Sequence, residues 1–371
     1  MKVLVVDDSV VYRKTISSIL KSQDCLEVVG EANHGKIALS MLERFDVDLI
    51  TLDMEMPELN GLETIEEINK AGYNVKILIF AAQTQRGAKN ALLALEKGAL
   101  DIIPKPSGDF ESFDAAMKHV EELLLPKVLE LKSTVEMEKA KAKSSTLTSV
   151  IAAPDTSPKK YEFPKLDVNT VIPKAIVIAS STGGPNALEE VVKSIKKSPA
   201  VPILIAQHMP PVFTLSLANR LSKISGVTCV EAKNGEAVEP GRVYIAPGDY
   251  HMEVRDNQSK SDLRIYLHKK AKRNDVRPCA NYLFESASAI WKNKLVGIVL
   301  TGMGADGMEG AIAVKKAGGC VIIQDEESST VWGMPRAVHE CGAYDTMTGI
   351  HQIGALVSKL SSSILDNVAS A

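Results

Sequence analysis

Short aliphatic runs alternate with amphipathic stretches along most of this chain, and this alternation constrains the fold more than any other feature. In residues 1–125 there are five almost continuously apolar runs, as is typical of strands buried on both faces: KVLVVDD, CLEVVGEA, VDLITLD, VKILIFAA and ALDIIPK. Helical patterns such as VVYRKTISSIL separate them. Strands that alternate with helices predict a parallel sheet covered on both faces, so we expect a doubly wound (βα)5 domain here.

A second alternation of the same kind fills residues 173–371. AIVIAS, PILIAQ, KLVGIVLTG and CVIIQDE are among its expected strands, and ALEEVVKSIKK and CANYLFESASAIW are among its expected helices. We predict a second doubly wound α/β domain, with a hairpin inserted around Tyr244 to Leu267. The segment with Trp332, Met334 and Pro335 is interpreted as a packed loop.

Residues 126–172 differ in composition from both halves. From Leu123 to Lys143 apolar residues are few and Lys and Glu are many, and the following stretch is rich in Ser, Thr, Pro and Lys. Such a composition with weak periodicity is typical of an exposed linker. We therefore predict two α/β domains, residues 1–125 and 173–371, joined by a linker.

The bulk composition excludes several classes of protein. A formal net charge of −3 and 5% aromatic residues give no global attraction to nucleic acid. The five cysteines are scattered and form no C-x-x-C pair, which indicates free thiols in a reducing compartment, with neither a disulfide framework nor a zinc site. No apolar stretch approaches the roughly 20 residues of a membrane span, and no signal peptide is evident at MKVLVV. We expect a cytoplasmic protein.

Acidic residues follow two of the predicted strands in the first domain. Asp7 and Asp8 follow the first strand, Asp53 ends the third, and Lys105 ends the fifth. These groups meet at one edge of a parallel sheet, where close carboxylates repel one another and need a divalent cation. Their hard oxygen ligands suit Mg²⁺, and one carboxylate could attack phosphorus. The alternative is that Asp7 and Asp8 only cap the following helix.

This set of residues resembles the receiver domain of bacterial two-component response regulators, over about residues 1–125. The resemblance implies that Asp53 accepts a phosphoryl group, that Asp7, Asp8 and Asp53 bind Mg²⁺, and that Lys105 contacts the phosphoryl group. It also implies a histidine kinase as the phosphoryl donor.

Two positions depart from the receiver pattern. The family usually has Ser or Thr at the end of the fourth strand, where this chain has Ala81, and an aromatic residue where it has Ile102. Thr84 lies nearby but out of register. These positions commonly relay phosphorylation to a distant face, so the departures bear on switching.

In the second domain, a hydroxyl, an imidazole and a carboxylate each follow a predicted strand. Ser181 follows AIVIAS, His208 follows PILIAQ, and Asp306 follows KLVGIVLTG. Side chains at the carboxyl ends of parallel strands point into one crevice. A serine that His208 deprotonates, with Asp306 orienting the imidazole, is the arrangement of an acyl-transfer site. Glycines after Ser181 permit a tight turn and a helix start that offers free N–H groups to an oxyanion.

Each of these residues has an alternative interpretation. The glycine turn after Ser181 could bind phosphate or cap a helix, and His208 could be a packed core histidine. Gly302, Gly304 and Gly307 match G-x-G-x-x-G after a strand, which is a dinucleotide-binding fingerprint. Against it, an Asp within the motif would place negative charge beside a pyrophosphate.

The second half contains another histidine near a strand end and a basic run. His251 is another candidate base, although its neighbours indicate a hairpin loop. The basic run from His268 to Arg273 could meet an acidic partner, or it could be a solvated face.

The three motifs, together with VYIAPGDYH, RPCANYLF and QDEESSTVWGMPRAV, resemble the chemotaxis protein methylesterase family over roughly residues 172–360. The resemblance implies phosphorylation-controlled hydrolysis of glutamyl methyl esters on methylated chemoreceptors, with release of methanol, and deamidation of certain receptor glutamines. It implies no metal or other cofactor in this domain. A non-enzymatic signalling adaptor and a dinucleotide enzyme are the rival functions.

By motif position, the resemblance implies that Ser181 is the nucleophile, His208 the general base and Asp306 the orienting acid. It also implies oxyanion donors among the backbone N–H groups near Thr182 and Met303.

Overall fold

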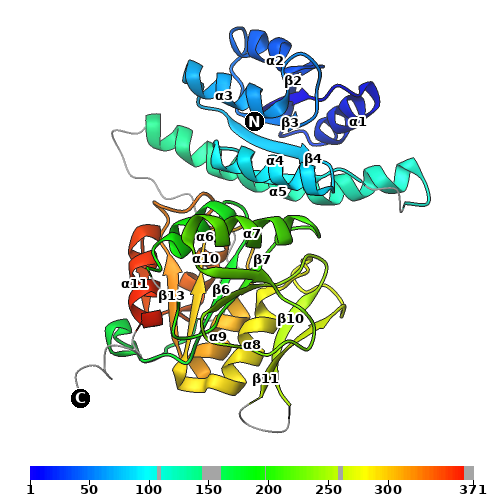
Figure 1. Cartoon of the computed structure of the whole chain (residues 1–371). Helices are drawn as coiled ribbons and strands as arrows, with labels where there is room; N and C mark the ends of the chain where they lie inside the picture. Colours follow the sequence, from blue (N-terminus) through cyan, green and yellow to red (C-terminus); the bar gives the residue numbers. More distant parts are fainter. Residues whose placement is uncertain (107–109, 144–159, 197, 258–261, 363–371) are drawn as a thin grey trace. The chain divides into compact units, whose positions relative to one another are not determined.

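The computed structural model describes the chain except residues 107–109, 144–159, 197, 258–261 and 363–371, and the side chains at 134 and 137–143. The chain divides into two compact units, Met1–Pro154 and Asp155–Ala371. Figure 1 labels the elements of both units.

The first unit is the predicted (βα)5 domain. Its elements are β1 (Lys2–Val6), α1 (Val10–Lys21), β2 (Glu27–Ala32), α2 (Gly35–Leu42), β3 (Leu49–Asp53), α3 (Gly61–Ala71), β4 (Lys76–Ala81), α4 (Gln85–Glu96), β5 (Asp101–Pro104) and α5 (Phe113–Lys143). All strand pairs are parallel, in the order β2-β1-β3-β4-β5. The chain leaves β1 toward β2 and later returns to β3 on the other side, so the topological switch point lies between β1 and β3.

The second unit is also doubly wound, as predicted. Its elements are η1 (Val168–Thr170), β6 (Ala175–Ser180), α6 (Gly184–Lys193), β7 (Ile203–Gln207), α7 (Phe213–Ser225), β8 (Thr228–Glu231), β9 (Arg242–Ile245), β10 (His251–Asp256), β11 (Leu263–His268), α8 (Ala280–Trp291), η2 (Lys292–Lys294), β12 (Leu295–Val299), α9 (Met308–Lys316), β13 (Cys320–Gln324), α10 (Gly333–Cys341), β14 (Thr346–Thr348) and α11 (Ile350–Ser362).

Seven parallel strands form the sheet of this unit, in the order β14-β13-β12-β6-β7-β9-β8. The chain moves from β6 to β7 in one direction and from β12 to β13 in the other. Because such crossovers are right-handed, α6 and α9 cover opposite faces of the sheet. In agreement, α6 packs with α7 and α11, whereas α9 packs with α8 and α10. The switch point lies between β6 and β12, so a crevice is expected at their carboxyl ends.

The predicted hairpin is present as an antiparallel pair outside this sheet, β10 with β11. Its strands start at His251, because Tyr244 belongs to β9. The segment that we interpreted as a packed loop is a helix from Gly333 onward, with Trp332 as its N-cap residue. Pro335 is tolerated there because it lies in the first helical turn.

The segment predicted as a linker contains regular structure at both ends. Helix α5 continues through Pro126 to Lys143, and its apolar residues recur at helical spacing: Val120, Leu124, Val128, Leu131 and Val135. Residues 144–159 lie outside the described part of the chain. The domain boundaries therefore stay a prediction, with helix extending well into the linker range.

The other end of the predicted linker packs on the second unit. Tyr161 and Phe163 contact its hydrophobic core, and the Tyr161 amide donates a hydrogen bond to the Cys341 carbonyl at 2.8 Å. The Lys315 ammonium donates to the Pro164 carbonyl at 3.1 Å. Apolar residues in this stretch are few, but Tyr161 and Phe163 contact the core.

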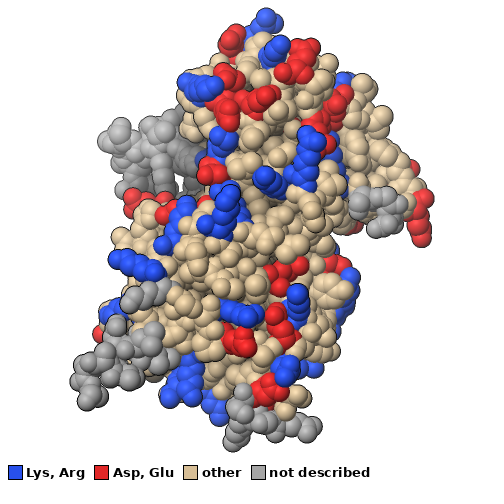
Figure 2. Space-filling view, in the orientation of Figure 1, with Lys and Arg blue, Asp and Glu red and all other residues tan. Residues whose placement is uncertain are grey.

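Charges of both signs are interspersed on the face drawn in Figure 2, in keeping with the small net charge. Among the described residues, no helix combines the length and the apolar character that a membrane crossing requires.

Candidate functional site

Ser181 and His208 follow neighbouring strands at the carboxyl edge of the second sheet. Ser180 pairs with Gln207 in the β6–β7 register, so Ser181 and His208 are the next residues on strands about 4.8 Å apart. The His208 amide donates to the Ser180 carbonyl at 3.1 Å, which continues the pairing to this point. Asp306 comes from the loop after β12, the other neighbour of β6. All three side chains therefore lie at the switch point.

The turn after Ser181 requires its two glycines. Gly183 has a positive φ of 76°, and a Cβ there would lie 2.4 Å from the Thr330 hydroxyl oxygen. A Cβ on Gly184 would lie 2.1 Å from the Gln207 side-chain oxygen. Helix α6 begins at Gly184, so its first N–H groups lie beside Ser181. The S-T-G-G sequence is thus explained by packing and backbone geometry at this corner.

The His208 imidazole and the Asp306 carboxylate are hydrogen-bonded, with 2.8 Å between Nε2 and Oδ2. Asp306 is 2% exposed, and its carboxylate accepts further hydrogen bonds. These come from the Cys279 thiol (3.0 Å) and from the amides of Ala280 (2.6 Å), Asn281 (3.2 Å) and Gly307 (2.9 Å).

Those hydrogen bonds decide the charge of Asp306. Burial alone would raise the pKa of Asp306, but the hydrogen bonds from His208, Cys279 and Ala280 lower it below its ordinary value. An ionised carboxylate only accepts hydrogen bonds, so Nε2 of His208 carries the proton that it donates to Asp306. The Nδ1 lone pair of a neutral His208 is then available as a base.

Ser181 is held by its backbone. Its amide donates to the Thr301 carbonyl at 3.0 Å, and its carbonyl accepts from the Gln207 side-chain amide at 3.0 Å. Ser181 is 5% exposed. Among the described residues, no hydrogen bond joins the Ser181 hydroxyl to the His208 imidazole. Catalytic hydrogen bonds often tighten only when substrate is bound.

Sequence analysis missed Gln207, although it is a buried polar residue that ends an apolar strand. Its side-chain oxygen accepts from Ser180 at 2.6 Å, and its side-chain amide contacts the carbonyls of Ser181 and His208. The polar end of PILIAQ was the available signal. Gln207 fixes the two strand ends that carry the hydroxyl and the imidazole.

The two predicted oxyanion donors lie at the same corner. Thr182 is 3% exposed, and its carbonyl accepts from the Thr301 hydroxyl at 3.0 Å. Met303 is half-buried, and its amide donates to no other described residue. Their role stays a prediction.

The acidic cluster of the first unit also gathers at a switch point. Carboxylate oxygens of Asp7, Asp8 and Asp53 lie within 4.8 Å of one another. The Lys105 ammonium lies 2.7 Å from Asp53 and 3.2 Å from Asp7. A set of hard oxygen donors this close fits Mg²⁺. The first helix is capped by Ser9, whose hydroxyl accepts from the Tyr12 amide, so the two aspartates are not its N-cap residue.

Burial and mutual repulsion act on these carboxyl groups. Burial raises the pKa of Asp53 to about 6, and the nearby charge of Asp7 adds to the shift while Lys105 opposes it. Burial likewise raises the pKa of Asp7. Removing these carboxylates from water without enough donors is unfavourable, and a bound cation would offset that cost.

The chain resembles known proteins along almost its whole length. The family model for CheB methylesterase matches residues 176–357, and the model for the response regulator receiver domain matches residues 3–117. A protein-glutamate methylesterase/protein-glutamine glutaminase of Pyrococcus horikoshii is 39% identical, over 97% of this chain and 93% of its own length. A second such protein, from Caulobacter vibrioides, is 38% identical over 98% of this chain and all of its own.

This chain belongs to the protein-glutamate methylesterase/protein-glutamine glutaminase family. The predicted resemblance is therefore confirmed, for both the receiver and the methylesterase halves. A solved structure, the CheB methylesterase catalytic domain of Thermotoga maritima, is 43% identical and covers 51% of this chain and 100% of its own, with a TM-score of 0.49.

The loop with Gly302, Gly304 and Gly307 is poorly suited to bind a dinucleotide. A pyrophosphate would need free amides at the start of α9, but the amides of Gly307 and Gly310 already donate to the Asn281 side-chain oxygen, at 3.1 and 2.7 Å. The Asp306 carboxylate also lies between the second and third glycines. The two amides are therefore already used within the protein, and the carboxylate would repel a pyrophosphate.

His251 is not placed to act as a base. Its Nδ1 accepts from the Cys279 amide at 3.1 Å, and its Nε2 lies 3.2 Å from the Ala271 carbonyl. It is fully buried, and burial lowers its pKa. The neighbouring basic run is paired with local acids, for example Lys269 with Asp249 at 2.7 Å.

The structure also places the two residues, Ala81 and Ile102, that depart from the usual receiver pattern. Ala81 is fully buried at the end of β4, and Ile102 is 5% exposed in β5. The Thr84 hydroxyl accepts from the Gly87 amide at 3.0 Å and so caps α4. Thr84 is thus committed to a helix start, and the hydroxyl usual at position 81 has no substitute there.

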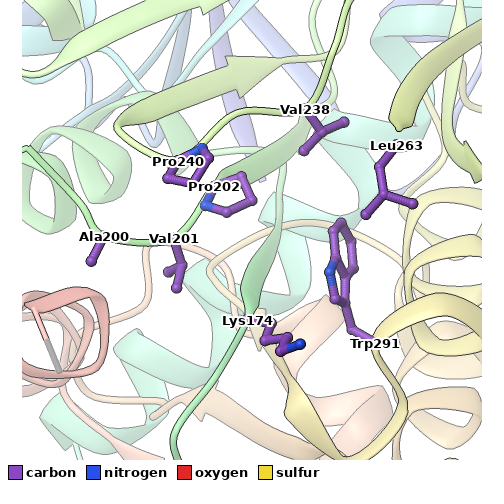
Figure 3. A pocket seen from close by; sticks show the side chains of 8 residues that line it. All are labelled: Lys174, Ala200, Val201, Pro202, Val238, Pro240, Leu263 and Trp291. Atoms are coloured by element: carbon purple, nitrogen blue, oxygen red, sulfur yellow. The ribbon is translucent and has the colours of Figure 1, made fainter. Parts of the chain in front are cut away.

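The second unit also has a pocket of about 300 Å³, whose lining side chains are drawn in Figure 3. Its lining is mostly apolar and includes Lys174, Pro202 and Trp291. Lys174 and Pro202 precede β6 and β7, so the pocket lies at the amino ends of the strands. It is therefore on the opposite edge of the sheet from the candidate site.

Proposed function

We propose that this protein hydrolyses glutamyl methyl esters on chemoreceptors, releasing methanol and restoring glutamate. The observation that carries the proposal is the 2.8 Å hydrogen bond between the His208 imidazole and the buried, ionised Asp306 carboxylate. His208 follows β7, which is the strand next to the one that leads into Ser181. The family membership supplies the class of substrate. The same site would deamidate receptor glutamines, since an amide and an ester share the acyl carbon that is attacked.

In the first step, the Ser181 oxygen attacks the ester carbonyl carbon while His208 Nδ1 takes the hydroxyl proton. Asp306 stabilises the imidazolium, and backbone amides near Thr182 and Met303 donate to the oxyanion. The C–OCH₃ bond then breaks, and the departing methoxide takes the proton from His208 as methanol. Water, deprotonated by the same imidazole, cleaves the glutamyl-serine ester and regenerates the hydroxyl.

The first unit controls this reaction. Asp53 accepts a phosphoryl group from a histidine kinase, and Asp7, Asp8 and Asp53 hold Mg²⁺, which supplies positive charge to the transferring group. Lys105, within 2.7 Å of Asp53, neutralises charge on the acyl phosphate. All five cysteines are free thiols, which suits a reducing compartment, so we place the reaction in the cytoplasm.

The nucleophile is tested by methanol release from methylated receptor membranes. Ser181→Ala should lower the rate by about 10⁴-fold or more, because a nucleophile is lost while the fold is kept. Ser180→Ala is the matched control, since it removes the adjacent hydroxyl, and it should cost at most about tenfold. Methanol release that survives in Ser181→Ala would overturn the assignment, and a wild-type protein without activity would favour a signalling adaptor.

Control is tested in the full chain with a small-molecule phosphoryl donor and Mg²⁺. Wild-type methanol release should rise with the donor, whereas Asp53→Asn should keep the basal rate and lose the response. A response that persists in Asp53→Asn would contradict the proposed phosphorylation site.

A further inference from the structure

Two helix starts in the second unit cap one another through Asp306 and Asn281. The Asp306 carboxylate, which precedes α9, accepts from the amides of Ala280 and Asn281 at the start of α8. In return, the Asn281 side-chain oxygen accepts from the amides of Gly307 and Gly310 at the start of α9. The first amides of a helix lack partners within the helix, so each side chain satisfies donors that would otherwise be buried and unpaired.

We propose that Asn281 is a positioning residue for the hydrolysis: by capping α9, it fixes the loop that presents the Asp306 carboxylate to His208. The inference rests on the proposed function, because it deepens the account of that same site. Asn281 makes no contact with Ser181 or with the imidazole among the described residues, so it acts through Asp306.

The surroundings of Asn281 allow little rearrangement. The residue is fully buried, and its side-chain nitrogen lies 3.2 Å from the Asn274 side-chain oxygen and 3.4 Å from a Glu309 carboxylate oxygen. At Gly310 the two helices approach closely, since a Cβ there would lie 3.3 Å from Asn281 Cα and 2.6 Å from Phe284 Cβ. Helices α8 and α9 therefore pack closely at Asn281, the residue whose side chain caps α9.

Loss of this cap should act on the orientation of Asp306. Without the Asn281 oxygen, the Gly307 and Gly310 amides are buried with fewer partners, and the loop holding Asp306 can shift. Asp306 keeps its own donors on α8, so the carboxylate stays ionised but is less well aimed at His208. Misplacement of a catalytic group by about 1 Å can cost on the order of 10²-fold in rate.

Steady-state methanol release from methylated receptor membranes provides the first test. Asn281→Ala should lower kcat by roughly 30- to 100-fold with KM changed less than about threefold. Asn281→Asp keeps an oxygen that can accept from both amides, but it places a negative charge beside Asp306 and Glu309, so it should regain only part of the lost kcat. Asn274→Gly removes the partner of the side-chain nitrogen while tolerating the positive φ of 56° at this position, and it serves as the control, with kcat within about twofold.

The second test follows the His208 ring by NMR in protein labelled with ¹⁵N-histidine, which needs no substrate turnover. Wild type should show the proton on Nε2, and Asn281→Ala should show a mixture of tautomers. This readout separates the inference from the proposed function, because it holds even if methanol is not released. If Asn281→Ala fails to fold, Asn281→Ser, too short to reach both amides, replaces it. An unchanged kcat and an unchanged His208 spectrum in a folded Ala or Ser variant would overturn the proposal.

Discussion

Asp53 and Asp306 are equally buried, at 2% exposure each, and both lie at the switch point of a parallel sheet. Yet the pKa of Asp53 is raised to about 6 and that of Asp306 is lowered. Asp53 has the Lys105 ammonium and the Glu55 amide, at 3.2 Å, beside the repelling carboxylate of Asp7. Asp306 instead lies at the start of a helix, among N–H and S–H donors and the His208 ring.

Hydrogen-bond donors, more than burial, decide what a strand-end carboxylate does. A carboxylate with few donors and a like charge nearby is suited to bind a cation and to react with phosphorus. A carboxylate with its oxygens fully hydrogen-bonded is unreactive, and it serves to hold and stabilise an imidazole. The same sheet edge therefore supports two chemistries.

Among the buried carboxylates, the largest expected effect is on activity, from Asp306→Asn. The variant should release methanol about 10³- to 10⁴-fold more slowly, because a neutral amide stabilises neither the required tautomer nor the imidazolium. Asp325→Asn is the control, since Asp325 follows β13 in the same sheet and binds only Ser328 and the local turn, and it should stay within about threefold. Equal losses in both variants would erase the distinction drawn for Asp306.

The stability of Asp306→Asn should also depend on pH. The pKa of Asp306 is lower in the folded protein, so its contribution to stability is present above the unfolded value of about 3.9 and is lost as pH falls through the folded pKa. Urea unfolding should therefore show Asp306→Asn destabilised by about 3 kcal/mol at pH 7 and by clearly less near pH 3. A deficit that is constant with pH would contradict a lowered pKa for Asp306.

A third buried carboxylate gives an intermediate effect, on stability alone. The Asp345 side chain is fully buried and pairs with Lys315 at 2.5 Å, while also accepting from the amides of Leu166 and Val321. Asp345→Ala leaves a buried ammonium unpaired, so the free energy of unfolding of the second unit should fall by about 3–5 kcal/mol. Thermal and urea unfolding would measure this.

The exposed pair between Arg242 and Glu239 is the control for that loss. Glu239→Ala should change the free energy of unfolding by less than about 1 kcal/mol, because solvent screens the pair. If the free energy of unfolding changed by a similar amount in the Glu239 and Asp345 variants, the buried pair would not anchor residues 164–166 to the rest of the second unit.

The smallest expected effect is at Thr84 in the receiver unit. Thr84→Ala should destabilise that unit by about 1 kcal/mol through loss of the α4 cap, and Thr84→Ser should restore it. Neither change should alter the response to a phosphoryl donor, because the hydroxyl is committed to Gly87. A lost response in Thr84→Ala would show that Thr84 takes over the relay at Ala81.

The placement of Ser181, His208 and Asp306 at one edge was predictable, because aliphatic runs mark buried strands and parallel strands share their carboxyl edge. The length of α5 was not predicted, although the spacing from Val120 to Val135 carried the signal beneath many Lys and Glu residues. Gln207 had a local signal, because it is the polar end of an apolar strand. The role of Asn281 depends on contacts between segments distant in sequence, and no local pattern distinguishes it from other buried polar residues.

We propose that the hydroxyl of Ser181 and the imidazole of His208 act as one unit. Methanol release should be compared among wild type, Ser181→Ala, His208→Gln and the double variant. Residues that act together give non-additive losses, so each single variant should lose about 10⁴-fold or more and the double variant should lose no more than either. Losses that multiply in the double variant, or a single variant that keeps near wild-type rates, would contradict the account.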